Sequence, residues 1–348
     1  MISICIIVRN EAKNLKMCLE KVIDYGYEII VIDTGSEDES KKVASDYTDK
    51  VFDFKWCNDF SAARNYAISK ATYKYIFMLD SDEFVIRLDK SELEILVTNH
   101  RNEVGRISRN NIFERNESRF VGVERVNRVF NKEYYHYEGK IHEQIVALNG
   151  DEYNTYEVPI TVDHSGYNGD FMERKKKADR NIHLLLQVIE EDGDEPYILY
   201  QLGKSYYMKK DYIEAVAYFK RAFVFDTNPR LEYVMDLVET YGYALLNSNQ
   251  KEKALQLLSI YNEFSHDADF VFMIANVYME NGYFDKAIEQ FLLATKFDNC
   301  KIVGVNSYLA YYNMGVIKEC LGDKKQALHY YRECGEYQQA KLGIQRCL

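Results

Sequence analysis

Long apolar runs are missing from this chain of 348 residues. No stretch of about 18 or more apolar residues occurs, so the sequence predicts no membrane-spanning helix. The first residues, MISICIIVRNE, have neither the basic leader nor the small-residue cleavage site of a signal peptide, and they are typical of a β-strand. We therefore expect a cytoplasmic protein.

Cysteine and proline are scarce in this sequence. The seven cysteines are scattered and include no Cys-x-x-Cys pair, which argues against a disulfide framework and against a zinc site. Free thiols are typical of a reducing cytoplasm. There are three prolines, and two of them, Pro196 and Pro229, lie near the boundaries of a helical repeat in the second half of the chain.

Positive charge is also in short supply. The formal net charge of -11 argues against nucleic-acid binding, which requires clustered Lys and Arg. With 47% hydrophobic and 28% charged residues, the composition is that of an ordinary globular protein, and the length allows two or three domains.

Strands and helices alternate over roughly the first 88 residues. Apolar, β-branched runs begin at Ile2, Tyr27 and Tyr75, and a stretch with helical spacing ends at Gly26. This alternation predicts a parallel sheet with right-handed crossovers and with both faces covered. Residues 89–170 are mixed, with a short helix near 91–98 and two or three further strands joined by long loops.

Residues 171–348 have a helical, repetitive pattern. Alanines 215, 254, 287 and 327 each open the second helix of a pair, a small residue precedes each by twelve positions, and a large one follows each by four. This pattern resembles the tetratricopeptide repeat, whose helix pairs stack into a solenoid. The first stretch, 171–192, is expected to form a helix that joins the solenoid to the sheet.

Polar side chains follow the predicted strands at the points where they end. Asp80, Ser81 and Asp82 follow the fourth strand, Asp33 ends the second, and residues 9–11 follow the first. Because ligands bind beyond the carboxyl ends of parallel strands, we expect these groups to meet at one edge of the sheet. An Asp-x-Asp pair can bind a divalent cation whose other ligands are phosphate oxygens.

The motifs IIVRNE, EIIVIDTGSED, FSAARNYA and YIFMLDSDEF, in that order, resemble the GT-A fold glycosyltransferases of family 2. NRVFNKEYYHYEGKIHEQI and VDHSGY are similar to the later motifs of the lipopolysaccharide-core and bacterial protein glycosyltransferase branches. The resemblance covers about residues 1–170. It implies a Rossmann-like GT-A α/β domain, with a nucleotide half at about 1–88 and an acceptor half at about 89–170, followed by an all-α tetratricopeptide-repeat solenoid at 171–348.

The resemblance also implies roles for single residues. Asp82 would be the main ligand of Mn²⁺ or Mg²⁺, with His164 as a second ligand, and Glu143 would be the catalytic base. Asp33 would bind the uracil or ribose, and Arg64 the pyrophosphate. The full set of residues expected to contact the nucleotide-sugar is Val8, Arg9, Glu11, Asp33, Arg64, Asp80 and Ser81.

Each role has a structural alternative. Glu143 could instead pair with Arg128 or Lys140, with Glu83 or Asp80 as the base. His164 could be a core histidine, Asp33 could cap the next helix, and Arg64 could pair with Asp59.

The resemblance implies an inverting, metal-dependent transfer of a sugar, with GlcNAc or Glc favoured, from a UDP-sugar. The expected acceptor is a Ser, Thr or Cys of a bacterial protein or peptide held by the repeats. Alternatives are a lipopolysaccharide-core or lipid-linked sugar acceptor, for which the only basic stretch is short (173–180), and a non-catalytic repeat scaffold. The repeats could also form a homodimer.

Overall fold

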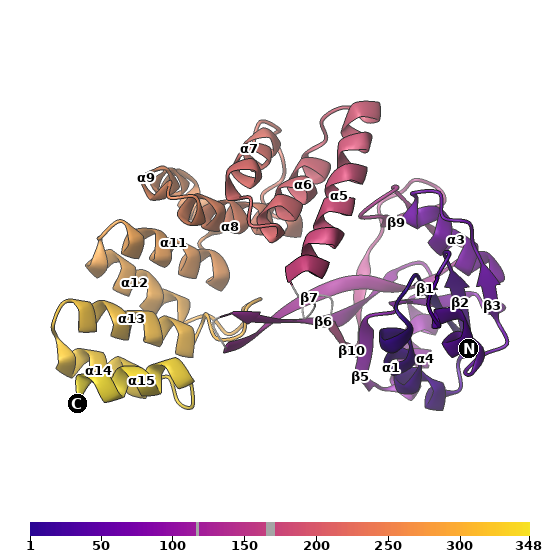
Figure 1. Cartoon of the computed structure of the whole chain (residues 1–348), viewed down its shortest axis with the longest axis horizontal. Helices are drawn as coiled ribbons and strands as arrows, with labels where there is room; N and C mark the ends of the chain where they lie inside the picture. Colours follow the sequence, from indigo (N-terminus) through magenta and orange to yellow (C-terminus); the bar gives the residue numbers. More distant parts are fainter. Residues whose placement is uncertain (116–117, 165–170) are drawn as a thin grey trace. The chain divides into compact units, whose positions relative to one another are not determined.

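The structure is a computed structural model that describes residues 1–115, 118–164 and 171–348. Side chains are described for these residues except 113–115, 118–119 and 171–174. The chain divides into two compact units, Met1–Asp170 and Phe171–Leu348. The first unit is an α/β domain and the second is helical, which confirms the predicted fold class (Figure 1).

The first unit is built on an eight-stranded sheet with the strand order β3-β2-β1-β4-β7-β6-β10-β5, beside a separate hairpin of β8 and β9. Its elements are β1 (Ile2–Val8), α1 (Ala12–Val22), the 3₁₀ turn η1 (Ile23–Tyr25), β2 (Glu28–Asp33), α2 (Ser40–Ser45), β3 (Val51–Asp53), α3 (Phe60–Lys70), β4 (Tyr75–Asp80), β5 (Glu83–Leu88), α4 (Lys90–Asn99), β6 (Val104–Arg115), β7 (Ser118–Asn131), β8 (Tyr135–Glu138), β9 (Gln144–Ala147) and β10 (Thr155–His164).

The sheet is parallel from β3 to β4 and mixed beyond. Apolar residues of α1 and α4 pack on one face, among them Leu19 and Leu93. Residues of α3 and of the β8–β9 hairpin, among them Ala67 and Ile145, pack on the other face. The central strands are therefore buried on both sides, as their continuous apolar sequences predict. Gly26 ends the first helical stretch with a φ of 66°, a left-handed conformation that glycine adopts without strain.

The prediction for residues 89–170 was wrong in its number of strands. The structure has five strands among the described residues there, β6 to β10, and a further strand, β5, directly after Asp82. Strands β5, β6 and β7 carry buried or half-buried charged residues, such as Glu83, Arg109 and Arg128, that pair with one another inside the domain. Because these strands contain charged residues, their sequences resemble those of polar loops, and the prediction missed some of them.

The second unit consists of successive helix pairs (Figure 1). Its elements are α5 (Phe171–Asp192), α6 (Pro196–Met208), α7 (Tyr212–Ala222), α8 (Glu232–Asn247), α9 (Lys251–Ala254), the 3₁₀ helix η2 (Leu255–Ile260), α10 (Tyr261–Phe264), α11 (Ala268–Glu280), α12 (Phe284–Ala294), α13 (Tyr308–Cys320), α14 (Lys324–Arg332) and α15 (Gln338–Cys347).

Small residues let the two helices of a pair approach closely. A Cβ atom at Gly203 would overlap the ring of Phe219, and one at Gly315 would overlap the ring of Tyr331. These are two of the small and large residues that define the predicted repeat. The second repeat differs, because its second helix is broken into α9, η2 and α10, and Gly242 meets Met273 instead of Leu258.

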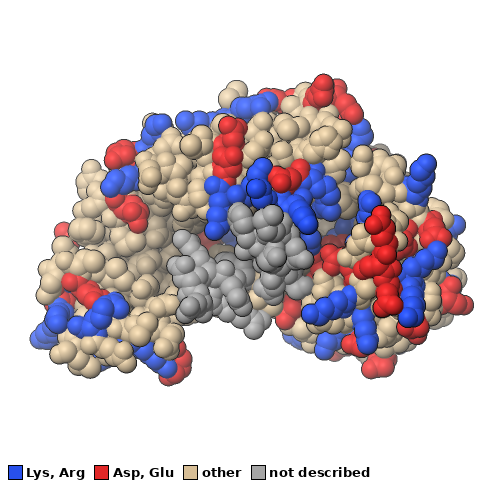
Figure 2. Space-filling view, in the orientation of Figure 1, with Lys and Arg blue, Asp and Glu red and all other residues tan. Residues whose placement is uncertain are grey.

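Within the described residues, no helix is both long enough and apolar enough to cross a bilayer. In Figure 2, Lys and Arg gather where Figure 1 places the N-terminal half of α5, whose described basic residues are Lys175, Lys176, Lys177 and Arg180. Over the rest of that face, side chains of both signs are interspersed.

Candidate active site

The ends of three neighbouring strands lie side by side. In the parallel register, Val8 of β1 is opposite Asp33 of β2, and Ile7 is opposite Asp80 of β4. Val8 is buried and its carbonyl accepts hydrogen bonds from the backbone N–H and the hydroxyl of Thr34. The polar groups that follow these strands are thus brought to one edge of the sheet.

Asp33 uses one carboxylate oxygen to fix the turn that follows it. Its Oδ1 accepts hydrogen bonds from the backbone N–H groups of Gly35 and Ser36, both at 2.9 Å. Its Oδ2 is buried and has no hydrogen-bond partner within the part of the chain that the structure describes. Helix α2 begins only at Ser40, so Asp33 does not cap it. A buried acceptor without a donor is costly, so this oxygen is suited to a ligand that donates to it.

Asp82 and His164 face one another across the ends of β4 and β10. The Nε2 atom of His164 lies 3.5 Å from Oδ2 of Asp82, and both side chains are more than four-fifths buried. The other ring nitrogen, Nδ1, lies 2.9 Å from Oδ1 of Asn111 on β6. A histidine that ligates a metal commonly donates its other N–H to an oxygen of this kind, which fixes the ring. Asn111 was not predicted from the sequence.

Asp82 and His164 fit a divalent cation for which the protein supplies only some of the ligands. The described residues contain no group of three or more His, Cys, Asp or Glu side chains arranged to hold a metal ion. Asp82 and His164 could supply two ligands, and the rest would have to come from phosphate and water, which is how Mg²⁺ is commonly bound with a nucleotide. The chemistry of this donor set therefore fits Mn²⁺ or Mg²⁺ bound together with a diphosphate.

Asp80 is held by two arginines. Its Oδ1 accepts from Nη2 of Arg64 at 2.8 Å and its Oδ2 accepts from Nη2 of Arg128 at 2.5 Å. Burial alone would raise the pKa of Asp80, but the charges of Arg128 and Arg64 hold it well below its usual range. Both oxygens of Asp80 are thus engaged in ion pairs, and its predicted contact with the nucleotide-sugar stays a prediction.

Glu83, Arg109 and Arg128 extend this network, and the sequence did not predict it. Glu83 is fully buried and its Oε1 accepts from Arg128 at 2.9 Å and from Arg109 at 3.2 Å. Its Oε2 accepts from the backbone N–H of Asp80. Glu83 is therefore poorly placed to meet an acceptor as the base. Arg128 lies in the stretch NRVFNKEYYHYEGKIHEQI, which was the one sequence signal that pointed to this network.

Glu143 lies between β8 and β9 and pairs with Arg64. Its Oε1 accepts from Nε of Arg64 at 2.5 Å. The observed ion pair of Glu143 is thus with Arg64, which is neither of its two alternative partners, Arg128 and Lys140. The alternative partner of Arg64 is also not observed, because Asp59 caps α3 by accepting from the backbone N–H of Ala62.

The remaining predicted residues occupy the same strand ends. Arg9 is exposed, and the backbone N–H of Glu11 donates to the hydroxyl of Ser40 at 2.9 Å. Ser81 is buried between Asp80 and Asp82. Their contacts with a nucleotide-sugar stay predictions. Residues 165–167 of the predicted motif VDHSGY lie outside the described residues.

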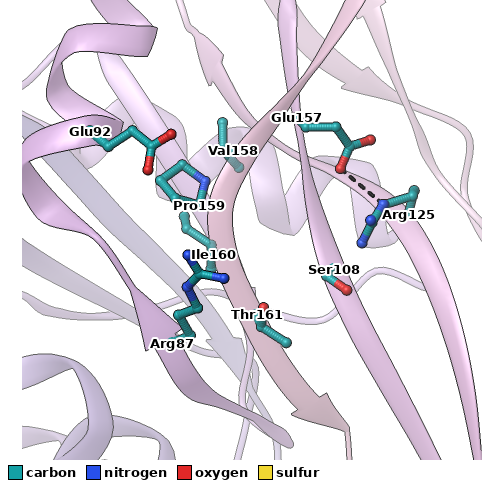
Figure 3. A pocket seen from close by; sticks show the side chains of 9 residues that line it. All are labelled: Arg87, Glu92, Ser108, Arg125, Glu157, Val158, Pro159, Ile160 and Thr161. Atoms are coloured by element: carbon teal, nitrogen blue, oxygen red, sulfur yellow. Dashed lines mark ion pairs between the residues drawn. The ribbon is translucent and has the colours of Figure 1, made fainter.

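A separate hollow of about 370 Å³ lies over β5, β6, β7 and β10 (Figure 3). It forms where the pairing of β10 with β6 is interrupted between Glu157 and Thr161. Arg125 and Glu157 form an ion pair of 2.9 Å on one side, and Arg87 and Glu92 come from the other side. No predicted site residue lines this hollow.

Comparison with known proteins bears on both units. Residues 3–141 match the model of glycosyl transferase family 2. Residues 196–228, 268–299 and 308–341 match tetratricopeptide-repeat models, and these stretches include three of the four predicted repeats. The predicted repeat that lies between them, near 232–264, is the one whose second helix is broken.

Two curated relatives have similar sequences. The SPbeta prophage-derived glycosyltransferase SunS of Bacillus subtilis is 30% identical over 220 residues, which is 62% of this chain and 52% of SunS. A TPR repeat-containing protein of Synechococcus elongatus is 31% identical over 211 residues, which is 58% of this chain and 51% of that protein. The chain therefore matches about half the length of these relatives.

Among solved structures, YrrB, a TPR protein with an unusual peptide-binding site, is similar to 49% of this chain, and the match covers 84% of YrrB. The TM-score is 0.41 at 21% identity, which is too distant a similarity to bear on function. The family matches, by contrast, confirm the resemblance of the first unit to glycosyl transferase family 2 and of the second to tetratricopeptide repeats. This chain carries a glycosyl transferase family 2 domain followed by tetratricopeptide repeats.

Proposed function

We propose that this chain is an inverting glycosyltransferase that uses Mn²⁺ or Mg²⁺ and a UDP-sugar, with GlcNAc or Glc as the favoured sugar. The observation that carries the proposal is the pair of Asp82 and His164, which face each other at 3.5 Å with Asn111 behind the imidazole. It lies at the end of β4, in a domain that matches glycosyl transferase family 2.

The donor would bind at the ends of β1, β2 and β4. Oδ2 of Asp33 would accept a hydrogen bond from the uracil or the ribose, because it is buried and lacks a donor in the described chain. Residues after β1 and β4 would line the nucleotide-sugar site; they are Val8, Arg9, Glu11, Asp80 and Ser81. The role of Arg64 at the pyrophosphate stays a prediction, because its guanidinium is already engaged with Asp80 and Glu143.

In the transfer step, the acceptor hydroxyl would attack the anomeric carbon as the bond to the nucleoside diphosphate breaks. The carboxylate of Glu143 would take the proton of the hydroxyl, a contribution typically worth roughly 10²- to 10⁴-fold in rate. A bound divalent cation would stabilise the negative charge of the leaving diphosphate. A single displacement without a covalent intermediate inverts the configuration at the anomeric carbon.

The acceptor is proposed to be a Ser or Thr, or a Cys, of a bacterial polypeptide. The support for a polypeptide is the series of tetratricopeptide repeats that follows the catalytic domain, because stacked helix pairs present an extended surface suited to binding a chain.

The experiment is an assay of UDP release from UDP-GlcNAc or UDP-Glc in the presence of Mn²⁺, with water as the acceptor. We expect Asp82→Ala to lower the rate by about 10²- to 10³-fold, the usual cost of losing one group that stabilises the transition-state charge. Asp46→Ala, which changes an exposed aspartate of the same domain, should leave the rate unchanged. Equal turnover by Asp82→Ala and the parent would refute the metal site.

A further inference from the structure

Hydrogen bonds join helix α3 to the hairpin of β8 and β9 and to the loop between these strands. The side chain of Asn65 donates to the carbonyl of Tyr137 at 2.8 Å and accepts from the N–H of Tyr137 at 2.9 Å. The N–H of Phe60, the first residue of α3, donates to the carbonyl of Lys140 at 2.9 Å. One helix therefore fixes the backbone of the hairpin at two points on the approach to Glu143.

The next contact fixes the carboxylate itself. Arg64 donates through Nε to Glu143 and through Nη2 to Asp80, so one guanidinium joins the two acids. The side chain of Arg64 is only 6% exposed, and its guanidinium lies 5.3 Å from the ring centre of Tyr137. Burial alone would lower the pKa of Arg64, but Asp80 and Glu143 outweigh it and raise that pKa further, so the guanidinium stays charged.

The backbone next to Glu143 adopts an unusual conformation. His142 has a φ of 52°, in the left-handed region that non-glycine residues rarely adopt. Gly139 has a φ of 98°, and a Cβ atom there would lie 3.5 Å from the Cα of Glu143. A backbone held in such a conformation persists only where surrounding contacts enforce it, and this occurs often at functional sites.

We propose that Arg64 and Asn65 are positioning residues that hold Glu143 in the orientation of a general base. Asn65 fixes the strand that precedes the loop, and Arg64 fixes the carboxylate relative to Asp80 at the end of β4. The proposal rests on the proposed function, because it assumes that Glu143 takes the acceptor proton. It differs from a role of Arg64 at the pyrophosphate, which would act on donor binding.

A conservative change at Arg64 separates the two roles. Lysine keeps the positive charge, but its single ammonium group cannot reproduce the planar fork that joins two carboxylates. If Arg64 orients the base, Arg64→Lys lowers kcat for UDP release by about 10- to 100-fold while the KM for the donor changes by less than about threefold. Arg101→Lys, at an exposed arginine that bonds the carbonyl of Thr98, is the matched control and should change neither.

A double-mutant cycle with Glu143→Gln tests whether Arg64 acts through the base. We expect Arg64→Lys to lower kcat by less than about twofold further in the Glu143→Gln background, because the orienting group then has no base to orient. Asn65→Ala, which leaves Arg64 and both acids in place, should show the same dependence on Glu143. Thermal melts of each variant establish that it is folded.

Two results would overturn the inference while the proposed function stands. One is a raised donor KM with an unchanged kcat in Arg64→Lys, which would place Arg64 at the pyrophosphate. The other is a decrease in kcat by Arg64→Lys that has the same size in the Glu143→Gln background as in the parent. Absence of UDP release by the folded parent protein would instead refute the proposed function, and this inference with it.

Discussion

At the scale of single residues, the ion pairs of Asp80 and Glu143 decide which of these two carboxylates is the better candidate for the general base. Asp80 is ionised throughout the physiological pH range because Arg128 and Arg64 outweigh the effect of burial and keep its pKa low. A carboxylate that binds protons so weakly and has both oxygens engaged is a poor general base. Glu143, which shares only one oxygen with Arg64 in the described contacts, is the better candidate.

At the same scale, Asp33→Asn separates the two uses of one carboxylate. Asparagine keeps the oxygen that accepts from Gly35 and Ser36, so the turn should remain, but it replaces the other oxygen with an amide donor. We expect affinity for UDP, measured by calorimetry with Mn²⁺, to fall about 10- to 100-fold, in line with the loss of one charge-assisted hydrogen bond.

The melting temperature of Asp33→Asn should stay close to that of the parent. Asp46→Asn, at an exposed site in the same domain, serves as the control and should bind UDP normally. Unchanged affinity in Asp33→Asn would show that the carboxylate serves only the turn.

At the scale of elements, the last helix is fixed to the repeat before it by one acid. Glu319 near the end of α13 accepts from Nε and Nη2 of Arg346 in α15, at 2.7 and 2.8 Å, and from the hydroxyl of Tyr331 in α14 at 2.5 Å. The hydrogen bonds from Arg346, together with that from Tyr331, lower the pKa of Glu319 to about 2. One carboxylate therefore joins three helices.

This contact predicts a pH-dependent contribution to stability. Because the folded-state pKa of Glu319 lies below its ordinary value of 4.5, the stabilisation is present above that pH and is lost as the pH falls towards 2. Glu319→Gln should lower the free energy of unfolding at pH 7 by about 0.5–1 kcal/mol, a value reduced by the exposure of Arg346.

Urea unfolding of the parent and of Glu319→Gln at a series of pH values measures this contribution. The difference between the two proteins should shrink as the pH is lowered from 4.5. A difference that persists at the lowest pH at which both fold would contradict the assignment. Glu333→Gln, at an exposed glutamate that follows α14, is the control.

At the scale of the whole molecule, the candidate active-site residues and the repeats lie in different units. The candidate active-site residues lie in Met1–Asp170, and the matched repeats lie in Phe171–Leu348. Each unit has its own apolar core, which is the condition for independent folding.

Separation of the units is therefore expected to separate binding of the donor from binding of the acceptor. Residues 1–170 alone should bind UDP with Mn²⁺ within about threefold of the affinity of the whole chain, because all the residues proposed to contact the donor lie within that unit. Residues 171–348 alone should give a cooperative helical melt by circular dichroism. Failure of residues 1–170 to bind UDP when the whole chain does so would show that the donor site needs the second unit.

The sequence by itself determined the features that depend on local pattern. Continuous apolar runs predicted the central strands, because a strand buried on both faces has no polar positions. The Asp-x-Asp pair after the fourth strand predicted the edge of the sheet at which the candidate site lies. The repeat could be predicted because close packing of the two helices of a pair requires a small residue opposite a large one, as at Gly203 and Phe219.

Only the tertiary structure decided which charges meet. Arg128 reaches Asp80 across 48 positions of sequence, and Arg64 reaches Glu143 across 79. These partners are set by the order and register of the strands and by the packing of α3 on the hairpin. Local sequence does not predict such pairing, because the residues next to an arginine in the sequence can be the same whether it forms a buried ion pair or lies on a loop. For that reason the polar strands and the residues that position Glu143 became visible only once the chain was folded.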